Sequence, residues 1–197
     1  MKLTGYFIYD DIEEFVGQAK EKQVHVGDQV LIHDIDGGAL YTVADIDEAA
    51  GHYFMVREHL LKDQKPIRRG KFNLFDWLND EYKKSLPEEL IELMVADADK
   101  LLINLPREIE VFGKNTYAHC EEAGHQWEYF KKTKNRIATV TDSDEWSHWW
   151  WLSTPEDDWN VASAADVCHC GSGGNAGCGV ASHADSYVRP RFILALA

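Results

Sequence analysis

The sequence is poor in positive charge and has no long apolar run. Its 197 residues carry 20 Lys and Arg against 34 Asp and Glu, which gives a formal net charge of −14. This excess of negative charge argues against binding nucleic acid through its phosphates and against binding an anionic membrane surface. No window approaches the ~18 apolar residues of a membrane span. We therefore expect neither nucleic acid nor a membrane among the partners.

Secretory and catalytic signatures are also missing. The opening residues MKLTGYFIYDDIEEF turn acidic at once and lack an apolar core segment, so we expect a chain made in a cytoplasm. There is no G-x-S-x-G nucleophile elbow, no H-E-x-x-H metal motif and no G-x-x-x-x-G-K-[ST] phosphate loop. Adjacent acidic pairs such as Asp157 and Asp158 are typical of solvated charges rather than of an acid–base pair. We expect no enzymatic activity.

Cysteine is scarce, yet three of the four cysteines fall in DVCHCGSGGNAGCGV, residues 166–180. Cys168, Cys170 and Cys178, with His169 and His183, are the ligand types that zinc prefers. However, C-x-C is not the C-x₂₋₄-C knuckle of most structural zinc sites, and no second knuckle accompanies it. We expect no metal and no cofactor. Redox pairing with Cys178 stays an alternative, and the favoured interpretation is small side chains in a loop.

The apolar pattern predicts an α+β domain. Helical spacing indicates a short helix over 10–22 and two helices over 73–96, the second opened by Pro87. Alternation predicts strands over 27–35, 38–47 and 52–61 as an antiparallel meander, and a terminal strand in SYVRPRFILAL. The stretch 100–113 predicts a short extended piece and then a turn or helical start at Pro106. A hydrophobic content of 45% is that of a soluble globular protein, and the length fits one domain.

Tryptophan is abundant, with four of the seven at positions 146, 149, 150 and 151. In a strand, Trp149 and Trp151 would face one side and Trp150 the other, so at least one side must belong to the core. We expect Trp77 to be core as well. Whether a tryptophan at the rim contributes to a ligand surface is left open against a purely structural role.

Five segments occur in a fixed order: FDWLNDEYKKSLPEELIELM, LLINLPREIEVFG, NRI, WWWLSTP and YVRPRFILAL. Together they resemble an uncharacterised domain family of gut bacteria and their phages, whose landmarks are W-L-N, W-W-L-R-S-P and G-V-R-P motifs. The resemblance runs from about residue 27 to the C-terminus. This chain departs from it by lacking an arginine between Leu152 and Ser153, and by carrying Tyr187 where glycine is usual.

That family is similar to the C-type-lectin-like fold, which variable proteins of diversity-generating retroelements and formylglycine-generating enzymes also use. The resemblance implies a C-type-lectin-like single domain over 27–197, with a mixed, mainly antiparallel sheet and two central helices. Residues 1–26 would form an N-terminal helical extension. VRPRFILAL should pair near the WWWLST strand, and Arg189 should bind backbone or carboxylate groups that fix the closing turn.

The retroelement comparison adds a compositional test. Adenine mutagenesis of asparagine-type codons cannot produce Glu, Lys, Gln, Met or Trp, and residues 160–188 contain none of these five. The resemblance therefore implies a variable ligand-binding segment over 159–188, in which the cysteines are outcomes of variation at exposed positions. The residues expected to contact ligand are Trp159, Asn160, Ser163, Asp166, His169, Ser172, Asn175, His183, Asp185 and Tyr187.

The favoured function is that of a phage-borne receptor-recognition protein, made in the host cytoplasm and located in the virion. Its partners would be a host cell-surface glycan or protein and other virion proteins, with a homo-oligomer as a further candidate assembly. Bacterial cytoplasm or cell surface is the alternative location. The rival functions are a structural virion or capsid-decoration protein and an enzyme of the formylglycine-generating type.

Overall fold

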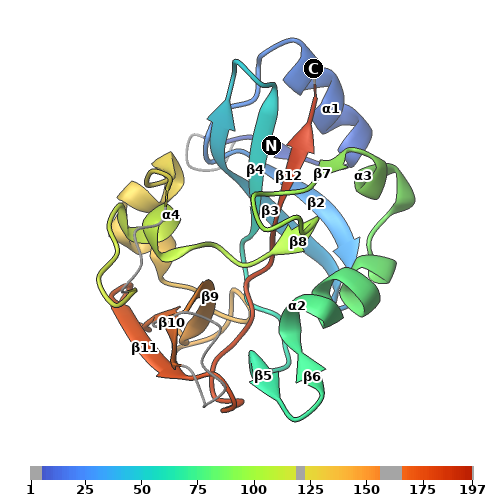
Figure 1. Ribbon diagram of the computed structural model, residues 1–197. Helices are drawn as coiled ribbons and strands as arrows, with labels where there is room; N and C mark the ends of the chain where they lie inside the picture. Colours follow the sequence, from blue (N-terminus) through green and yellow to red (C-terminus); the bar gives the residue numbers. More distant parts are fainter. Residues whose placement is uncertain (1–5, 119–122, 156–165, 197) are drawn as a thin grey trace.

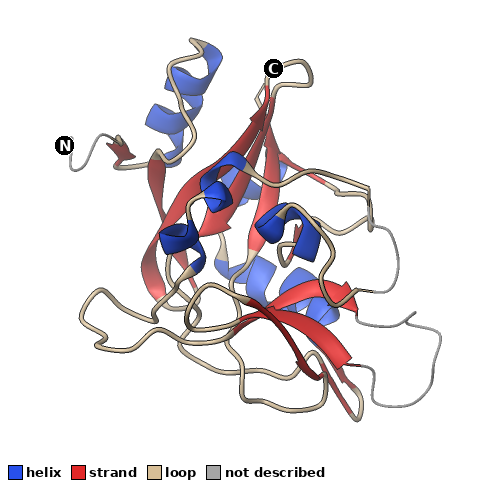
Figure 2. Cartoon of the chain, turned by 90° about the vertical axis from the view of Figure 1, so that its left-hand side faces the viewer, coloured by secondary structure: helices blue, strands red, loops and turns tan. Residues whose placement is uncertain are grey.

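The computed structural model describes residues 6–118, 123–155 and 166–196, and it shows an α+β fold with mainly antiparallel sheets, as predicted (Figures 1 and 2). Within these residues, the largest sheet has seven strands in the order β1-β2-β3-β4-β12-β7, with β8 also paired to β12. Its strands are β1 (Ile8–Tyr9), β2 (Gln29–Asp34), β3 (Gly37–Asp47), β4 (His52–Arg57), β7 (Met94–Val95), β8 (Ile103–Asn104) and β12 (Arg191–Ala195).

Two smaller sheets lie at the opposite end of the molecule from the C-terminus (Figure 1). A three-stranded sheet has the order β11-β10-β9, and a hairpin pairs β5 with β6. Their strands are β5 (Arg68–Arg69), β6 (Phe72–Asn73), β9 (Trp150–Pro155), β10 (Asp166–Cys170) and β11 (Ala176–Val180). No helix of the described residues is long and apolar enough to cross a bilayer.

The predicted meander is confirmed. β2, β3 and β4 pair antiparallel in sequence order, with Val30 opposite Tyr41 and Thr42 opposite Val56. Along β2, Val30 and Ile32 are buried while Leu31 is exposed, which is the period-two pattern of a strand with one face on the core.

The helix predicted over 10–22 is also confirmed as α1 (Ile12–Lys20). It begins at Asp11, whose Oδ1 accepts a hydrogen bond from the Glu14 amide at 2.8 Å. Phe15 is fully buried and packs edge-on against Tyr9 and Tyr53. The helix assigned to the 1–26 extension thus shares its apolar face with the main core.

The central helices are confirmed, but their form is mixed. The first segment runs through α2 (Leu74–Trp77), a π-helical turn (Leu78–Tyr82) and a 3₁₀ turn (Lys83–Ser85), and the second is α3 (Glu88–Glu92). Leu74, Leu78 and Tyr82 are fully buried on one face. Trp77 is only partly buried at the border of this cluster. We expected it in the core, and it packs against the core without being enclosed by it. Its ring instead lies 4.4 Å beneath the Lys65 ammonium.

The chain after Pro106 forms short helices, as its pattern suggested. α4 (Glu108–Phe112) ends at Gly113, which adopts the left-handed conformation at φ 73°. The polar and aromatic stretch that follows is mostly irregular, with two 3₁₀ turns, Glu128–Lys131 and Thr133–Arg136.

The closing strand pairs differently from our expectation. β12 lies in the main sheet between β4 and β7, whereas β9 belongs to the three-stranded sheet. The two are joined through Tyr187, whose carbonyl accepts from the Trp151 amide at 3.0 Å and whose amide donates to the Trp149 carbonyl at 2.8 Å. The Pro190 carbonyl then accepts from the Arg57 amide at 3.0 Å, next to the paired residues of β4 and β12. The chain therefore leaves β9 and enters the main sheet.

Arg189 binds as predicted, at the point where the chain changes sheets. Its guanidinium is 1% exposed and donates to the carbonyls of Arg57 at 2.8 Å, Asn135 at 3.0 Å and Glu58 at 3.2 Å. It also lies over the Trp150 ring, 5.1 Å from the centroid. One side chain thus satisfies three backbone carbonyls from two segments, one at the end of β4 and one in the 3₁₀ turn Thr133–Arg136.

Replacing Arg189 with methionine should lower the free energy of unfolding by at least about 3 kcal/mol, because three acceptors would lose their donors. Urea unfolding followed by tryptophan fluorescence measures this loss. Lys84→Met, on an exposed surface, is the control and should stay within about 0.5 kcal/mol of the parent. Equal stability of the two variants would contradict the role given to Arg189.

Candidate ligand-binding surface

The three-stranded sheet positions the tryptophan run and the cysteine-rich segment side by side. β9 and β10 pair antiparallel, with Trp151 opposite His169 and Trp150 opposite Cys170. Side chains on opposite residues share a face of the sheet, so Trp151 and His169 lie on one face. Trp150 and Cys170 lie on the other. Trp151 packs in the main core and Trp150 in a second core, which confirms the alternation predicted for the run.

Trp149 is the exposed member of the run, and it stacks on a buried histidine. Its ring is 4.9 Å from the His169 ring with 15° between the planes, and its side chain is 50% exposed. His169 is only 6% exposed and meets Trp151 edge-on at 6.1 Å. Because the histidine is held from below and from the side, the outer face of Trp149 is presented to solvent in a fixed orientation.

Glycine on β11 makes room for this histidine. Gly177 is directly opposite His169, and a Cβ added there would overlap the His169 Nε2 atom. A Cβ at Gly179 would lie 3.4 Å from Nδ1. The imidazole therefore rests against bare backbone, an approach that a side chain at position 177 would prevent.

Burial determines the protonation state of His169. It lowers the pKa of the imidazole, and the negative charge of Asp185 opposes part of that effect. The Nδ1 atom is buried and has no hydrogen-bond partner among the described residues. The ring is therefore neutral at pH 7, which suits stacking against Trp149.

Tyr187 lies on the other side of the sheet. Its backbone forms a bridge to Trp150 and its side chain packs against the second core, with its ring tilted by 37° against the His148 ring at 4.6 Å. The structure thus does not bring Tyr187 and His169 together on one face.

His183 and Asp185 belong to the loop after β11. This loop leads to Tyr187, which pairs with Trp150 on the edge of β9 that does not face β10. Both are exposed, and Asp185 Oδ2 lies 3.8 Å from His183 Nδ1. With Arg69 they line an open depression of about 430 Å³. Gln64 donates to the Asp185 carbonyl at 3.3 Å, which ties the loop to the chain before β5. These two predicted residues are therefore brought together.

The other predicted residues are more scattered. Asp166 is half-buried at the start of β10, while Ser172 and Asn175 lie in the β10–β11 turn. That turn is closed by the Gly171 amide, which donates to the Asn175 carbonyl at 2.8 Å. Trp159, Asn160 and Ser163 fall outside the described residues.

The cysteines do not occupy exposed positions, so that part of the expectation is wrong for two of them. Cys168 and Cys170 are fully buried in the second core, and Cys178 is half-buried. Burial raises the pKa of Cys170 to about 12, so its thiol stays protonated at neutral pH. In the part of the chain that the structure describes, no group of three His, Cys, Asp or Glu side chains could hold a metal ion.

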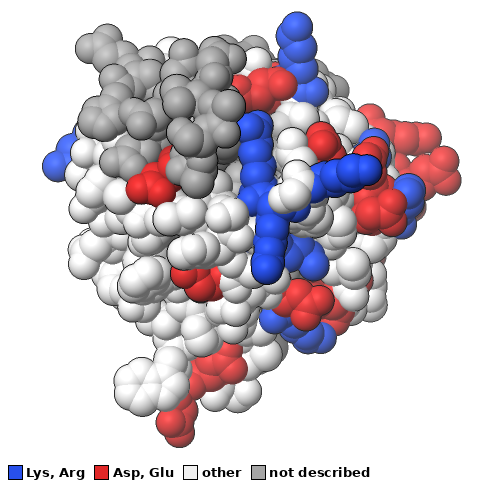
Figure 3. All heavy atoms as spheres, turned by 60° about the horizontal axis from the view of Figure 1, so that its bottom comes forward, with Lys and Arg blue, Asp and Glu red and all other residues white. Residues whose placement is uncertain are grey.

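Sequence reasoning did not select Trp146 and Trp149 as contact residues. Trp146 is 75% exposed. The alternation of the run assigned Trp149 to one side without showing that this side opens to solvent at position 149. Seen from the end that carries β5, β6 and the three-stranded sheet, the surface has a broad, mostly uncharged area, and basic and acidic side chains adjoin one another beside it (Figure 3).

Residues 101–196 match a family described as a domain of unknown function (DUF6273). This supports the coarser part of the resemblance, an uncharacterised domain family, over a span that begins later than residue 27. The span contains β8 to β12 and with them the candidate surface apart from Arg69. No curated protein and no solved structure gives a significant match.

Substituting Gly177 with alanine should lower the free energy of unfolding by about 1–3 kcal/mol, because His169 must move out of a packed position. Gly17 is the matched control. It lies mid-helix with open space at its Cβ, so Gly17→Ala should instead raise stability by about 0.5–1 kcal/mol. Thermal unfolding of both variants measures this, and a neutral Gly177→Ala would contradict the packing described.

His169 should also make stability fall with acid. Its pKa in the folded protein is below the unfolded value of 6.5, so the unfolded chain binds more protons as the pH drops. The contribution of the neutral ring to the free energy of unfolding is fully present above pH ~6.5. It is lost as the pH falls below that value, because protonation then favours the unfolded chain. The melting temperature of the parent should therefore fall more steeply from pH 7.5 to 5.5 than that of His169→Phe. Parallel curves would contradict a depressed pKa.

Proposed function

We propose that this protein is a ligand-recognition protein without enzymatic activity, which displays its C-terminal surface on a rigid scaffold of the C-type-lectin-like kind. Among the described residues, the surface comprises Trp146, Trp149 and the depression around Asp185. It is carried on a phage particle and recognises a glycan or protein of the host cell surface. The observation that carries the proposal is the half-exposed Trp149 ring stacked on buried His169.

A pre-positioned aromatic ring is suited to recognition. Trp149 loses little side-chain entropy on binding, because its stacking partner already fixes the ring. An exposed indole offers a large apolar face and one hydrogen-bond donor, and tryptophan is among the residues that contribute most to binding energy. The charged groups of the neighbouring depression add polar contacts around it. This combination favours a ligand with both an apolar face and hydroxyl or amide groups.

The buried thiols count against the cysteine-dependent enzyme as the alternative. A nucleophilic or metal-binding cysteine needs an accessible thiolate. Cys168 and Cys170 are both fully buried, and burial raises the pKa of Cys170 to about 12. Cys120 falls outside the described residues. Packing is the role that the two buried side chains perform in the described structure.

A capsid-decoration role is the second candidate. Exposed tryptophans would serve equally as contacts to a neighbouring virion protein or to a second copy of the chain. A decoration protein would keep these contacts regardless of the host, whereas a receptor-binding surface would not. Host dependence of binding therefore separates the two functions.

The proposal predicts that Trp149→Ala weakens adsorption of the purified, fluorescently labelled protein to intact gut bacteria by about tenfold or more. Its folding should persist, because the ring is half-exposed. The control is Ile35→Ala, which removes an equally exposed apolar side chain, 52% exposed, from the β2–β3 turn. Adsorption is measured on a panel of strains, with thermal melting recorded beside it.

Binding to particular strains that is lost in Trp149→Ala but kept in Ile35→Ala would support receptor recognition. Adsorption that Trp149→Ala leaves unchanged on every strain would reject this surface. Failure of Trp149→Ala to assemble on the phage particle would instead support the decoration role. The diversified origin of 160–188 has a separate test, since it requires a near-copy of that coding segment, differing at adenines, beside a reverse transcriptase.

A further inference from the structure

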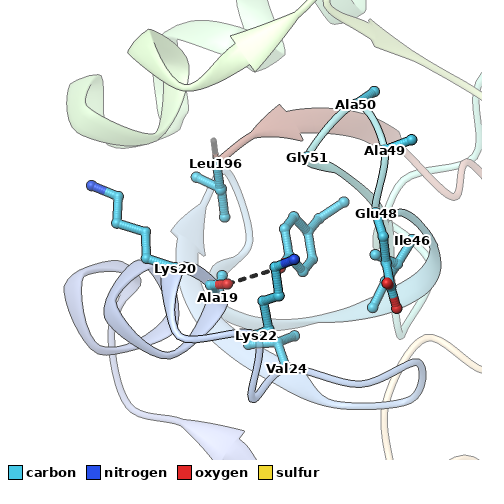
Figure 4. Close-up of a pocket in the computed structure, with 11 residues that line it drawn as sticks. Ala19, Lys20, Lys22, Val24, Ile46, Glu48, Ala49, Ala50, Gly51 and Leu196 are labelled. Atoms are coloured by element: carbon cyan, nitrogen blue, oxygen red, sulfur yellow. Dashed lines mark hydrogen bonds between the residues drawn. The ribbon is translucent and has the colours of Figure 1, made fainter.

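A second pocket lies at the other end of the molecule, between the end of α1 and the β3–β4 hairpin (Figure 4). Its volume is about 450 Å³, within the range of small-molecule sites. Leu196, after β12, closes one side. The pocket lies outside the surface described above and largely outside residues 101–196.

The inner wall of this pocket is apolar. Val24, Tyr53 and Leu196 are buried side chains that contribute to it, and Ala19 and Ile46 add further apolar surface. The hydrogen of the Tyr53 hydroxyl is not available to a ligand, because it is donated to the Ala19 carbonyl at 3.0 Å. A ligand with an apolar body would therefore meet an apolar floor.

The charged groups stand at the rim. Lys20, Lys22 and Glu48 line the pocket, so ammonium groups outnumber carboxylates there in a chain whose net charge is −14. Figure 4 shows the Lys22 amine directed over the pocket from the wall opposite Glu48, while the Lys20 amine points outward. Lys22 is thus the cation that an anionic ligand would meet in the pocket, with the Glu48 carboxylate on the opposite wall.

The backbone at Lys22 is unusual for a lysine. Helix α1 ends in a Schellman motif, in which the Lys22 amide donates to the Ala19 carbonyl at 2.9 Å and the Gln23 amide donates to the Gln18 carbonyl at 2.9 Å. The residue in this position takes the left-handed conformation, normally as glycine, and Lys22 adopts it at φ 56°. Non-glycine residues held in this conformation cluster at ligand sites, and Lys22 lines a pocket.

We propose that this pocket binds a small amphipathic carboxylate, with its apolar body on the Tyr53 floor and its carboxylate on the Lys22 ammonium. Lys20 adds positive charge at the outer rim, and Glu48 limits affinity by repulsion. This binding is independent of the recognition surface on the three-stranded sheet, so either can fail alone.

The test uses octanoate as the probe, with octylammonium and 1-octanol as probes of the same chain length. Titration is followed by two-dimensional NMR of the full chain. Octanoate should shift the amide signals of Ala49, Ala50 and Gly51, and should bind about tenfold more tightly than octylammonium. Octanoate shifts confined to other residues, or equal binding of all three probes, would overturn the proposal.

Lys22→Gly separates binding from folding. It should raise Tm by about 2–4 °C, since glycine relieves the left-handed strain, and weaken octanoate about 5–10-fold. Lys100→Gly is the matched control, because Lys100 is an exposed lysine at φ 64° in a distant turn. It should raise Tm similarly and leave octanoate affinity unchanged.

Two charge variants complete the test. Lys22→Met keeps a long side chain without its charge and should weaken octanoate to the same extent as Lys22→Gly. Glu48→Gln removes the opposing carboxylate and should tighten octanoate about 2–5-fold. Octanoate affinity that is the same in Lys22→Gly, Lys22→Met and the parent would show that the ammonium takes no part.

Discussion

The guanidinium of Arg189 connects the two cores of the molecule. The main core lies beneath the seven-stranded sheet, and the second core holds Trp150, Phe130 and the buried cysteines. Arg189 donates to backbone carbonyls on β4, just after it, and in the 133–136 turn, and it lies over aromatic rings of the second core. Only arginine offers enough donors for three separate acceptors in one plane. The relative position of the two sheets therefore depends on this side chain.

A buried network of polar side chains adjoins the Arg189 site, because Arg57 takes part in both. Arg57, whose carbonyl accepts from Arg189, donates its own Nε to Asp34 at 2.8 Å, and the Tyr41 hydroxyl donates to the same carboxylate at 2.7 Å. Tyr82, from the π-helical turn, also hydrogen-bonds to Asp34 and Tyr41. Burial alone would raise the pKa of Asp34, but the hydrogen bond and charge of Arg57 lower it. The carboxylate stays ionised, so the helical segment is held to the meander by a charged acceptor.

These constraints leave the three-stranded sheet with little freedom. Both faces of β9 and β10 are packed, whereas β11 is partly exposed along its length. What remains for recognition is the margin of the sheet, where Trp149 is exposed and the loop after β11 begins. Gly177 allows His169 to lie close to the strand, and His169 fixes Trp149. The exposed position of the Trp149 ring is thus a consequence of core packing. The pocket beside Lys22 differs, because there the chain keeps a lysine in a conformation that suits glycine better.

The sequence by itself determined the local elements. Period-two alternation predicted β2, β3 and β4, helical spacing predicted α1 and the central helices, and the WWW run implied opposite faces for Trp150 and Trp151. Tertiary structure alone decided that β12 pairs with β4 rather than β9, and that DVCHC is a strand buried on both faces. The physical reason is the sequence separation of the contacts involved. Alternation reports which side chains share a face, but partner choice and burial depend on contacts between distant segments, such as Gly177 against His169 and Arg189 against Arg57. The sequence of β11 is rich in glycine and therefore has the pattern of a loop. Only its pairing with β10 shows that it is a strand.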